Sequence, residues 1–397
     1  MSGFLKRTWV EVDLDAIKYN YLQIRKRVPR ESKIMCVVKA DAYGHGAEFL
    51  TKEYESLGAD WFAVSNLEEA IQLRENGISR PILILGYTPV CEAKTLLQLN
   101  ISQAVLSEDY AQKLSDAANR AGGRISVHIK LDSGMSRIGI ACQNDLMCEH
   151  AVDSVKNIYK LPGICVQGLF THFAVSDYGA QGEHETKEQY RKFQEVVSAL
   201  KASGYEIPLC HCSNSGAILD YPEMSLNMVR AGIILYGLSP SAKINNNVEL
   251  RPAMQLKTVI SQIKTVERDT AVSYGRTFIT KRQTRIATVP IGYADGYLRS
   301  FSNTAQMLVC GKRVPVIGRV CMDQLMIDVT EVPEAKEGNC VTVFGKDGES
   351  FISVDELALL DNSINYEIIC LIGKRVPRIY IKNGEHFGLI NYILRHQ

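Results

Sequence analysis

The sequence lacks an excess of charge of either sign. It holds 45 basic and 44 acidic residues among 397, which leaves a formal net charge of +1. Like charges are also dispersed, with no run of about five or six. Nucleic acid and anionic membranes attract concentrated basic patches, so this pattern argues against both as partners. We therefore expect the partner to be a small molecule.

Long apolar stretches are also missing. No stretch approaches the roughly 18 consecutive apolar residues of a membrane span. Residues 1–10 lack the apolar core of a secretory signal. These absences predict a protein that does not associate with membranes and stays in the cytoplasm.

Closely spaced cysteine pairs of the C-x-x-C type are absent too. The eleven cysteines are scattered along the chain, which favours reduced thiols over a disulfide framework. The densest cluster is Cys210-His211-Cys212, in an alternating run that places the two thiols on one strand face and the imidazole on the other. A structural zinc site needs more ligands at suitable spacing, so we interpret the cluster as buried strand packing and predict no metal.

Short apolar runs alternate with amphipathic segments from Ile34 to about Tyr236. The runs are IMCVVK, WFAV, ILIL, QAVL, SVHIKL, VQGLF, IPLCHC and NMVR. One intervening helix is indicated by Asn66 as its cap and Gly77 as its terminator, and another over residues 107–122. Apolar strands alternating with helices predict a parallel sheet covered on both faces. Eight such units favour a TIM-type (β/α)₈ barrel, with an open doubly wound sheet as the alternative.

The pattern changes after Pro240. The segment SAKINNNVELRPA is polar and irregular, and beyond it the apolar period becomes two in MQLKTVISQI, RIATVPIGY, GKRVPVIGRV, QLMIDVT and NCVTVFG. This period predicts an antiparallel, mainly-β domain interrupted by one short helix near residues 354–360. We therefore predict a barrel over residues 11–243, and a separate C-terminal β domain over residues 244–397 that also takes a strand from residues 1–10.

Lys39 follows the first predicted barrel strand, and the chemistry of such barrels lies at the carboxyl ends of their strands. The whole segment VVKADAYGHG around it resembles the signature of the alanine racemase family. Further segments resemble other motifs of that family, in the family's order and along nearly the full chain. They are KLDSGMSRIG, THFAVSD, HCSNSGA, NMVRAGIILYGLSP, VSYG, GYADGY, GRVCMDQ, NYE and RVPR.

The resemblance implies an isomerase that depends on pyridoxal 5'-phosphate and interconverts L- and D-alanine, supplying D-alanine for peptidoglycan. The lysine that matches Lys39 carries the cofactor as a Schiff base. An arginine matching Arg230 faces the pyridine nitrogen and keeps its own proton, which disfavours transamination and decarboxylation. The cofactor contacts implied by the resemblance are Lys39, Tyr43, His172, Ser215, Arg230, Gly232, Ile233 and Tyr366.

Racemisation removes a proton from one face of the substrate and delivers one to the other, so two bases are expected. Lys39 serves one face, and Tyr274 resembles the family's base on the opposite face. Tyrosine is a poor base at neutral pH without positive charge or hydrogen-bond donors nearby, which His172 and Arg230 supply by resemblance. The implied substrate contacts are Arg137, Met322 and Asp323, and Lys130 matches a lysine that is carbamylated in many family members.

Tyr274 lies in the predicted β domain, far along the chain from Lys39. In the resembling family the β domain of one subunit completes the barrel site of the other, which implies a homodimer with shared active sites. Three alternatives remain. A serine racemase would differ little in substrate volume. A non-catalytic barrel that binds pyridoxal phosphate would need no Tyr274, and a decarboxylase would carry an acid in place of Arg230.

Overall fold

The computed structural model describes residues 4–245 and 248–394. The chain forms two compact units, which we call the barrel unit (residues 17–42 and 47–251) and the β unit (residues 1–16, 43–46 and 252–397). Residues 1–3, 246–247 and 395–397 fall in the predicted β domain and lie outside the described residues. Whether the predicted domains, residues 11–243 and residues 244–397 with 1–10, fold independently stays a prediction.

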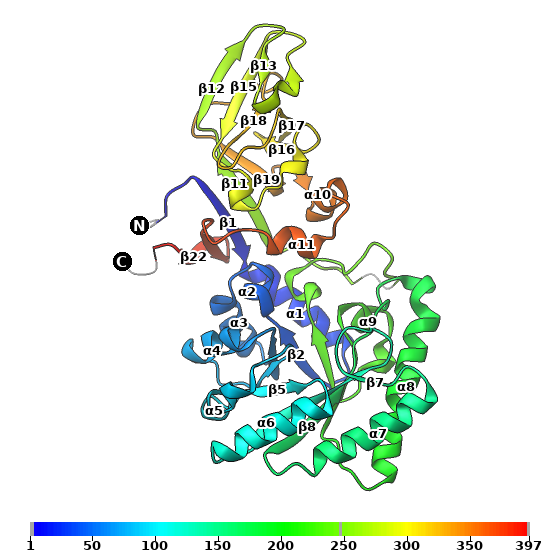
Figure 1. Ribbon diagram of the computed structural model, residues 1–397. Helices are drawn as coiled ribbons and strands as arrows, with labels where there is room; N and C mark the ends of the chain where they lie inside the picture. Colours follow the sequence, from blue (N-terminus) through cyan, green and yellow to red (C-terminus); the bar gives the residue numbers. More distant parts are fainter. Residues whose placement is uncertain (1–3, 246–247, 395–397) are drawn as a thin grey trace. The chain divides into compact units, whose positions relative to one another are not determined.

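Eight parallel strands form a nearly closed barrel, so the TIM-type fold predicted from the apolar runs is confirmed (Figure 1). Their order is β10-β2-β3-β4-β5-β6-β8-β9, and a short strand β7 (Ile140–Ala141) pairs with β6. At the seam between β9 and β10, the amide of Asn227 donates to the carbonyl of Cys210 at 3.2 Å and that of Arg230 to Ser213 at 2.9 Å. The eight strands are β2 (Lys33–Val37), β3 (Trp61–Val64), β4 (Ile82–Ile84), β5 (Ser102–Val105), β6 (Ile125–Asp132), β8 (Ile164–Phe170), β9 (Leu209–His211) and β10 (Met228–Ala231).

The helices between the strands begin at side-chain caps. Asn66 Oδ1 accepts the amide of Glu69 at 3.0 Å and starts α4 (Leu67–Glu75) where the sequence predicts it. Ser107 does the same for α6 (Glu108–Arg120), the second predicted helix. The other right-handed α-helices of this part of the chain are α1 (Leu14–Arg27), α3 (Ala47–Ser56), α5 (Ala93–Gln98), α7 (Asp145–Tyr159), α8 (Glu183–Ala202) and α9 (Ser215–Asp220), whereas the segment labelled α2 (Lys39–Tyr43) has left-handed φ angles. No helix in the described part of the chain is both long and apolar enough to cross a bilayer.

The β unit is built on an eleven-stranded, mostly antiparallel sheet in the order β12-β15-β18-β17-β16-β19-β11-β1-β21-β22, with β20 added on β19. The N-terminal strand β1 (Thr8–Asp13) pairs antiparallel with β11 (Met254–Val259) and parallel with β21 (Arg378–Lys382). The remaining strands of this sheet are β12 (Gln262–Val266), β15 (Thr284–Val289), β16 (Gln306–Val309), β17 (Lys312–Ile317), β18 (Leu325–Asp328), β19 (Cys340–Asp347), β20 (Ser350–Ile352) and β22 (Glu385–Ile390). Two short strands, β13 (Ala271–Val272) and β14 (Phe278–Ile279), form a separate hairpin.

Two helices interrupt the β unit, so the prediction of a single helix is wrong. The first, α10 (Val354–Leu360), lies where it was predicted and is capped by Ser353. The second, α11 (Asn365–Cys370), follows Ile364, which provides no side-chain cap. A six-residue helix without a cap leaves too short an apolar pattern to be recognised in the sequence.

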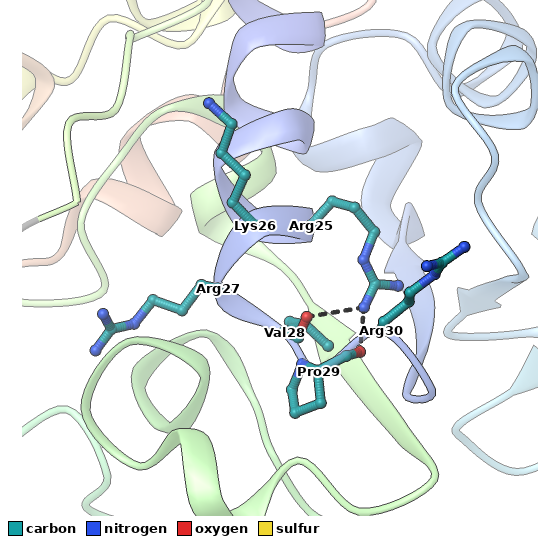
Figure 2. A pocket seen from close by; sticks show the side chains of 6 residues that line it. All are labelled: Arg25, Lys26, Arg27, Val28, Pro29 and Arg30. Carbon is teal, nitrogen blue, oxygen red and sulfur yellow. Dashed lines mark hydrogen bonds between the residues drawn. The ribbon is translucent and has the colours of Figure 1, made fainter.

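An open, basic pocket of about 650 Å³ lies at the end of α1 and is lined by residues 25–30 (Figure 2). Two of its three guanidinium groups, those of Arg25 and Arg27, donate to backbone carbonyls. Arg25 donates to the carbonyls of Ser32, Val28 and Pro29, and Arg27 donates to the carbonyl of Ile218 at 3.4 Å. Cationic side chains commonly satisfy the last carbonyls of a helix in this way. We therefore interpret the pocket as the cap of α1 rather than as a catalytic site.

Candidate active site

The predicted site residues of the barrel unit lie at or just beyond the carboxyl ends of the strands. Lys39 follows β2, His172 follows β8, and Arg230 lies in β10 next to its end. Lys130 occupies the third-last position of β6, and Ser215 begins the helix after β9. Because parallel strands of a closed barrel end at one rim, these elements bring residues far apart in sequence to the same rim.

The backbone directly after Lys39 adopts a left-handed turn. Ala40, Asp41, Ala42 and Tyr43 have φ angles of 51°, 54°, 53° and 54°. Such a run costs roughly 1–2 kcal/mol for each residue that is not glycine. Two carboxylates hold the turn: Glu69 accepts the amide of Ala40 at 2.7 Å, and Asp41 accepts that of Ala47 at 2.8 Å. Strain of this kind persists where surrounding contacts enforce it and is concentrated at functional sites.

Arg230 is a buried cation whose contacts are carbonyls and imidazoles. Its side chain donates to the carbonyls of Thr171 at 2.7 Å, Cys212 at 2.9 Å and His211 at 3.1 Å. It also contacts the Nδ1 atoms of His211 at 2.9 Å and His172 at 3.3 Å. Burial lowers the pKa of Arg230 to about 10, which still leaves it charged at neutral pH. Within the described residues no carboxylate forms an ion pair with it.

A chain of neutral imidazoles continues from Arg230 into the barrel. Burial, with Arg230 as the next cause, lowers the pKa of His211 well below its usual value and that of His128 to about 3. Arginine only donates, so His211 Nδ1 must accept, and His211 Nε2 then donates to His128 Nδ1 at 2.9 Å. The guanidinium thus fixes the tautomers of both rings. The sequence analysis missed this pair, although strand alternation places His128 on the same face as Lys130.

Four basic side chains influence the pKa of His172, and one of them, Arg230, contacts its ring. After burial, the charges that lower the pKa of His172 are those of Arg230, Arg137, Lys130 and Lys39, in decreasing order. Residues from four different βα segments therefore form one electrostatic neighbourhood at the rim of the barrel. Such a neighbourhood favours anionic ligands and holds the imidazole neutral.

Lys130 is 2 % exposed and donates through Nζ to the carbonyl of Leu131. Burial is the largest influence on its pKa, which is lowered to about 8; Arg230 and Arg137 lower it further, while Asp132 raises it. The carboxylate of Asp132 accepts the amides of the following turn, including that of Ser136 at 3.0 Å. Arg137, next in that turn, is exposed.

Three of the predicted cofactor contacts form a local cluster in the barrel unit. The amide of Gly232 donates to the hydroxyl of Ser215 at 3.0 Å, and Ser215 is 5 % exposed. Asn214 caps α9 by accepting the amide of Ala217 at 3.0 Å. Ile233 begins a short 3-10 helix. The structure thus brings together Ser215, Gly232 and Ile233, three of the cofactor contacts that the resemblance implies.

The remaining predicted residues, Tyr43, Tyr274, Met322, Asp323 and Tyr366, belong to the β unit. The rings of Tyr43 and Tyr366 lie with their centroids 6.0 Å apart. Burial raises the pKa of Tyr43, so its phenol stays protonated and can donate. Gly44 explains the close approach of the two segments, because a Cβ there would lie 2.4 Å from the carbonyl oxygen of Ile369 in α11.

Met322 and Asp323 are held by the GYADGY turn and by Arg375. The amide of Ala294 donates to the carbonyl of Met322 at 3.0 Å. Gly292 must be glycine here, because a Cβ would lie 2.3 Å from that same carbonyl oxygen. Asp323 forms an ion pair with Arg375 at 2.8 Å, from the RVPR motif. Three of the motifs, GYADGY, GRVCMDQ and RVPR, therefore contact one another in the fold.

Comparison with known proteins identifies the family of this chain. The family descriptions "Alanine racemase, N-terminal domain" and "Alanine racemase, C-terminal domain" match residues 12–240 and 253–380. A curated protein named alanine racemase 2, from Caldanaerobacter subterraneus, is 45 % identical over 99 % of this chain and 100 % of its own length.

The chain belongs to the alanine racemase family.

Solved structures of alanine racemases agree with this assignment and confirm the resemblance predicted from the motifs. The structure of alanine racemase from Clostridium difficile 630 is 40 % identical, with a TM-score of 0.92, over 98 % of this chain and all of that one. That of alanine racemase from Bacillus anthracis, titled with bound L-Ala-P, is 38 % identical, with a TM-score of 0.92, over 99 % of both chains. The racemase fold therefore extends over both units of the chain.

Proposed function

We propose that this protein is an alanine racemase that interconverts L- and D-alanine with pyridoxal 5'-phosphate. The observation that carries the proposal is the buried Arg230, which contacts the imidazoles of His211 and His172 at the barrel rim where Lys39 also lies. Lys39 supplies an amine for covalent attachment of the cofactor, and Arg230 supplies a permanent charge for its ring. The full-length match to the alanine racemase family supports the same activity.

The side chains suit pyridoxal phosphate chemically. Arg230 carries a permanent charge and no carboxylate partner among the described residues, which suits a contact with a pyridine nitrogen that keeps no proton of its own. Ser215 and the amides of Gly232 and Ile233 would hold the phosphate, with the phenols of Tyr43 and Tyr366 as further donors. When bound, the cofactor would make the α-hydrogen of the amino acid acidic by withdrawing electrons from the α-carbon.

The protein's own groups would then move the proton. Lys39 Nζ would remove or return the α-proton on one face of the substrate, and Tyr274 Oη would do so on the other. Arg137, Met322 and Asp323 would orient the substrate carboxylate. Inversion follows when one base removes the α-proton from one face and the other base delivers a proton to the opposite face.

The proposal includes a homodimer in the cytoplasm that supplies D-alanine for the cell wall. The β unit exposes large side chains that a second copy would cover, among them Tyr274 at 73 % and Met322 at 54 %. Exposed apolar groups gathered on a surface commonly mark an interface. In this dimer Tyr274 of each subunit would serve the Lys39 site of its partner.

The test is direct incubation of the purified protein with L-alanine or L-serine, followed by chiral chromatography. We expect D-alanine to form faster than D-serine. If D-serine dominates, the racemase mechanism stands but the substrate is serine. Cofactor absorbance without either product would instead favour the non-catalytic barrel that binds pyridoxal phosphate, or the decarboxylase.

We further propose that Lys130 carries a carbamate. Its pKa of about 8 leaves roughly a tenth of the amine neutral at pH 7, and a neutral amine attacks CO₂ with loss of one proton. The product is an anion beside Arg137, which replaces a repulsion between two cations with an attraction. In the presence of ¹³C-bicarbonate we expect a carbamate resonance that grows as the pH rises from about 6 to 8, because deprotonation exposes the nucleophile.

The control for this experiment is the exposed Lys113, which pairs with Asp109 at 2.7 Å. Lys130→Ala should abolish the resonance, whereas Lys113→Ala should retain it. A wild-type protein that racemises alanine but shows no such resonance would contradict the carbamate and leave the racemase proposal intact.

A further inference from the structure

The loop that carries Tyr274 has a backbone conformation that residues with side chains seldom adopt. Ser273 has φ 66° and ψ −178°, a region occupied almost exclusively by glycine. Gly275 and Arg276 also have positive φ angles, of 70° and 50°. Positive φ angles therefore flank Tyr274 on both sides, and those of Ser273 and Arg276 are strained because both residues carry a Cβ.

Contacts to the segment before Met322 hold Ser273 in this conformation. Ser273 Oγ donates to the carbonyl of Arg319 at 2.8 Å and lies 3.6 Å from Cys321 Sγ. Gly318 leaves room for it, since a Cβ on Gly318 would lie 2.7 Å from Ser273 Cβ. A strained residue persists only where its surroundings enforce the conformation, and here the enforcing contacts come from a segment 46 positions away.

Asn303 ties the other end of the same loop. Its Oδ1 accepts the amide of Gly318 at 2.6 Å, and its Nδ2 donates to Thr277 Oγ1 at 3.2 Å. Within one chain Tyr274 is 73 % exposed, so its ring is not packed before a second copy covers it. Within the chain, the backbone held on both sides sets the direction of its side chain.

We propose that Ser273 is a positioning residue for the proton transfer made by Tyr274. Its strained backbone sets the direction of the Tyr274 side chain, and its hydroxyl prevents the loop from relaxing. This inference rests on the proposed function, in which Tyr274 is one of the two bases. Proton transfer needs heavy atoms about 2.6–3.2 Å apart, and a displacement near 1 Å can lower a rate by about 100-fold.

Two variants separate the hydroxyl from the strain. Ser273→Ala removes the hydrogen bond and keeps the strain, whereas Ser273→Gly removes both. We expect kcat to fall roughly 10- to 100-fold in each. The thermal midpoint of Ser273→Gly should stay within about 2 °C of the wild type, because relief of strain offsets the lost bond. Amide hydrogen exchange of residues 272–279 should become faster in both variants, a readout that requires no catalysis.

Isotope exchange in D₂O reports directly on which base is impaired. With Tyr274 misplaced, the enantiomer served first by Lys39 should take up α-deuterium without inversion, because Lys39 returns a solvent-exchanged proton to the same face. The other enantiomer should exchange more slowly, because its α-proton faces Tyr274. General damage to the fold would lower the exchange of both enantiomers equally.

Matched controls come from the same unit. Ser261→Ala removes another hydroxyl-to-carbonyl bond, of 3.0 Å to Thr288, and Asp269→Gly relieves another positive φ, of 63°. Both control variants should keep the wild-type kcat and the wild-type ratio of α-deuterium exchange between the two enantiomers. If the Ser273 variants also keep them, or lose the exchange of both enantiomers equally, the positioning role is wrong. A wild-type protein that inverts neither enantiomer would instead overturn the proposed function, and this inference with it.

Discussion

Lys39→Ala is expected to abolish racemisation, lowering kcat by at least about 10⁴-fold, because it removes both the covalent attachment of the cofactor and one of the two bases. The visible absorption of the covalently held cofactor should disappear with it. Both losses have one cause, since alanine has no amine. Chiral chromatography and an absorbance spectrum of the purified variant measure the two effects.

Lys33 offers a matched control. It is the exposed first residue of β2, the same strand that Lys39 follows, and its side chain forms no hydrogen bond or ion pair described in the structure. Lys33→Ala should therefore keep wild-type activity and absorbance. If Lys39→Ala retained either property, the assignment of the cofactor lysine would be wrong.

Tyr274→Phe should lower kcat by roughly 10²- to 10⁴-fold, the usual contribution of a general base, while cofactor absorbance remains. Only the hydroxyl is removed and the ring remains, so the thermal midpoint should change little. Tyr87→Phe, which removes the phenol of another exposed tyrosine, is the control and should be neutral. Equal loss of activity in both variants would argue against Tyr274 as a base.

Mixing the two inactive variants tests whether the sites are shared. A hybrid dimer of Lys39→Ala and Tyr274→Phe subunits would contain one site with both native residues, so unfolding and refolding them together should restore part of the activity. Sites formed within single chains would stay inactive in every combination. Such a result would contradict the shared dimer but not the roles of the two residues.

Much of the fold could be predicted from the sequence because its signals are local. The apolar runs that became β2 to β6 and β8 to β10 are continuous, as expected of strands buried on both faces. Asn66 and Ser107 mark helix starts through bonds only three residues long. The second helix of the β unit escaped notice because α11 has neither length nor a cap.

The sequence predicted which residues form the candidate site but not how the fold arranges them. Ordered motifs identified Lys39, Arg230 and Tyr274, but no motif signalled the left-handed turn after Lys39, where alanine and aspartate adopt a conformation usually marked by glycine. His211 was interpreted as strand packing, and the structure also gives it a hydrogen bond to Arg230. Its neutral state depends on burial, which alternation alone does not quantify.

The sequence by itself determined the family, the barrel and the identity of the groups proposed to carry the chemistry, because periodicity, caps and motifs are properties of neighbouring residues. The tertiary structure alone decided how those groups are held. Arg230 reaches the carbonyl of Thr171 across 59 positions, and Ser273 reaches that of Arg319 across 46. Tautomers, lowered pKa values and strained φ angles arise from such distant contacts, since each depends on which polar groups and charges surround a residue after folding.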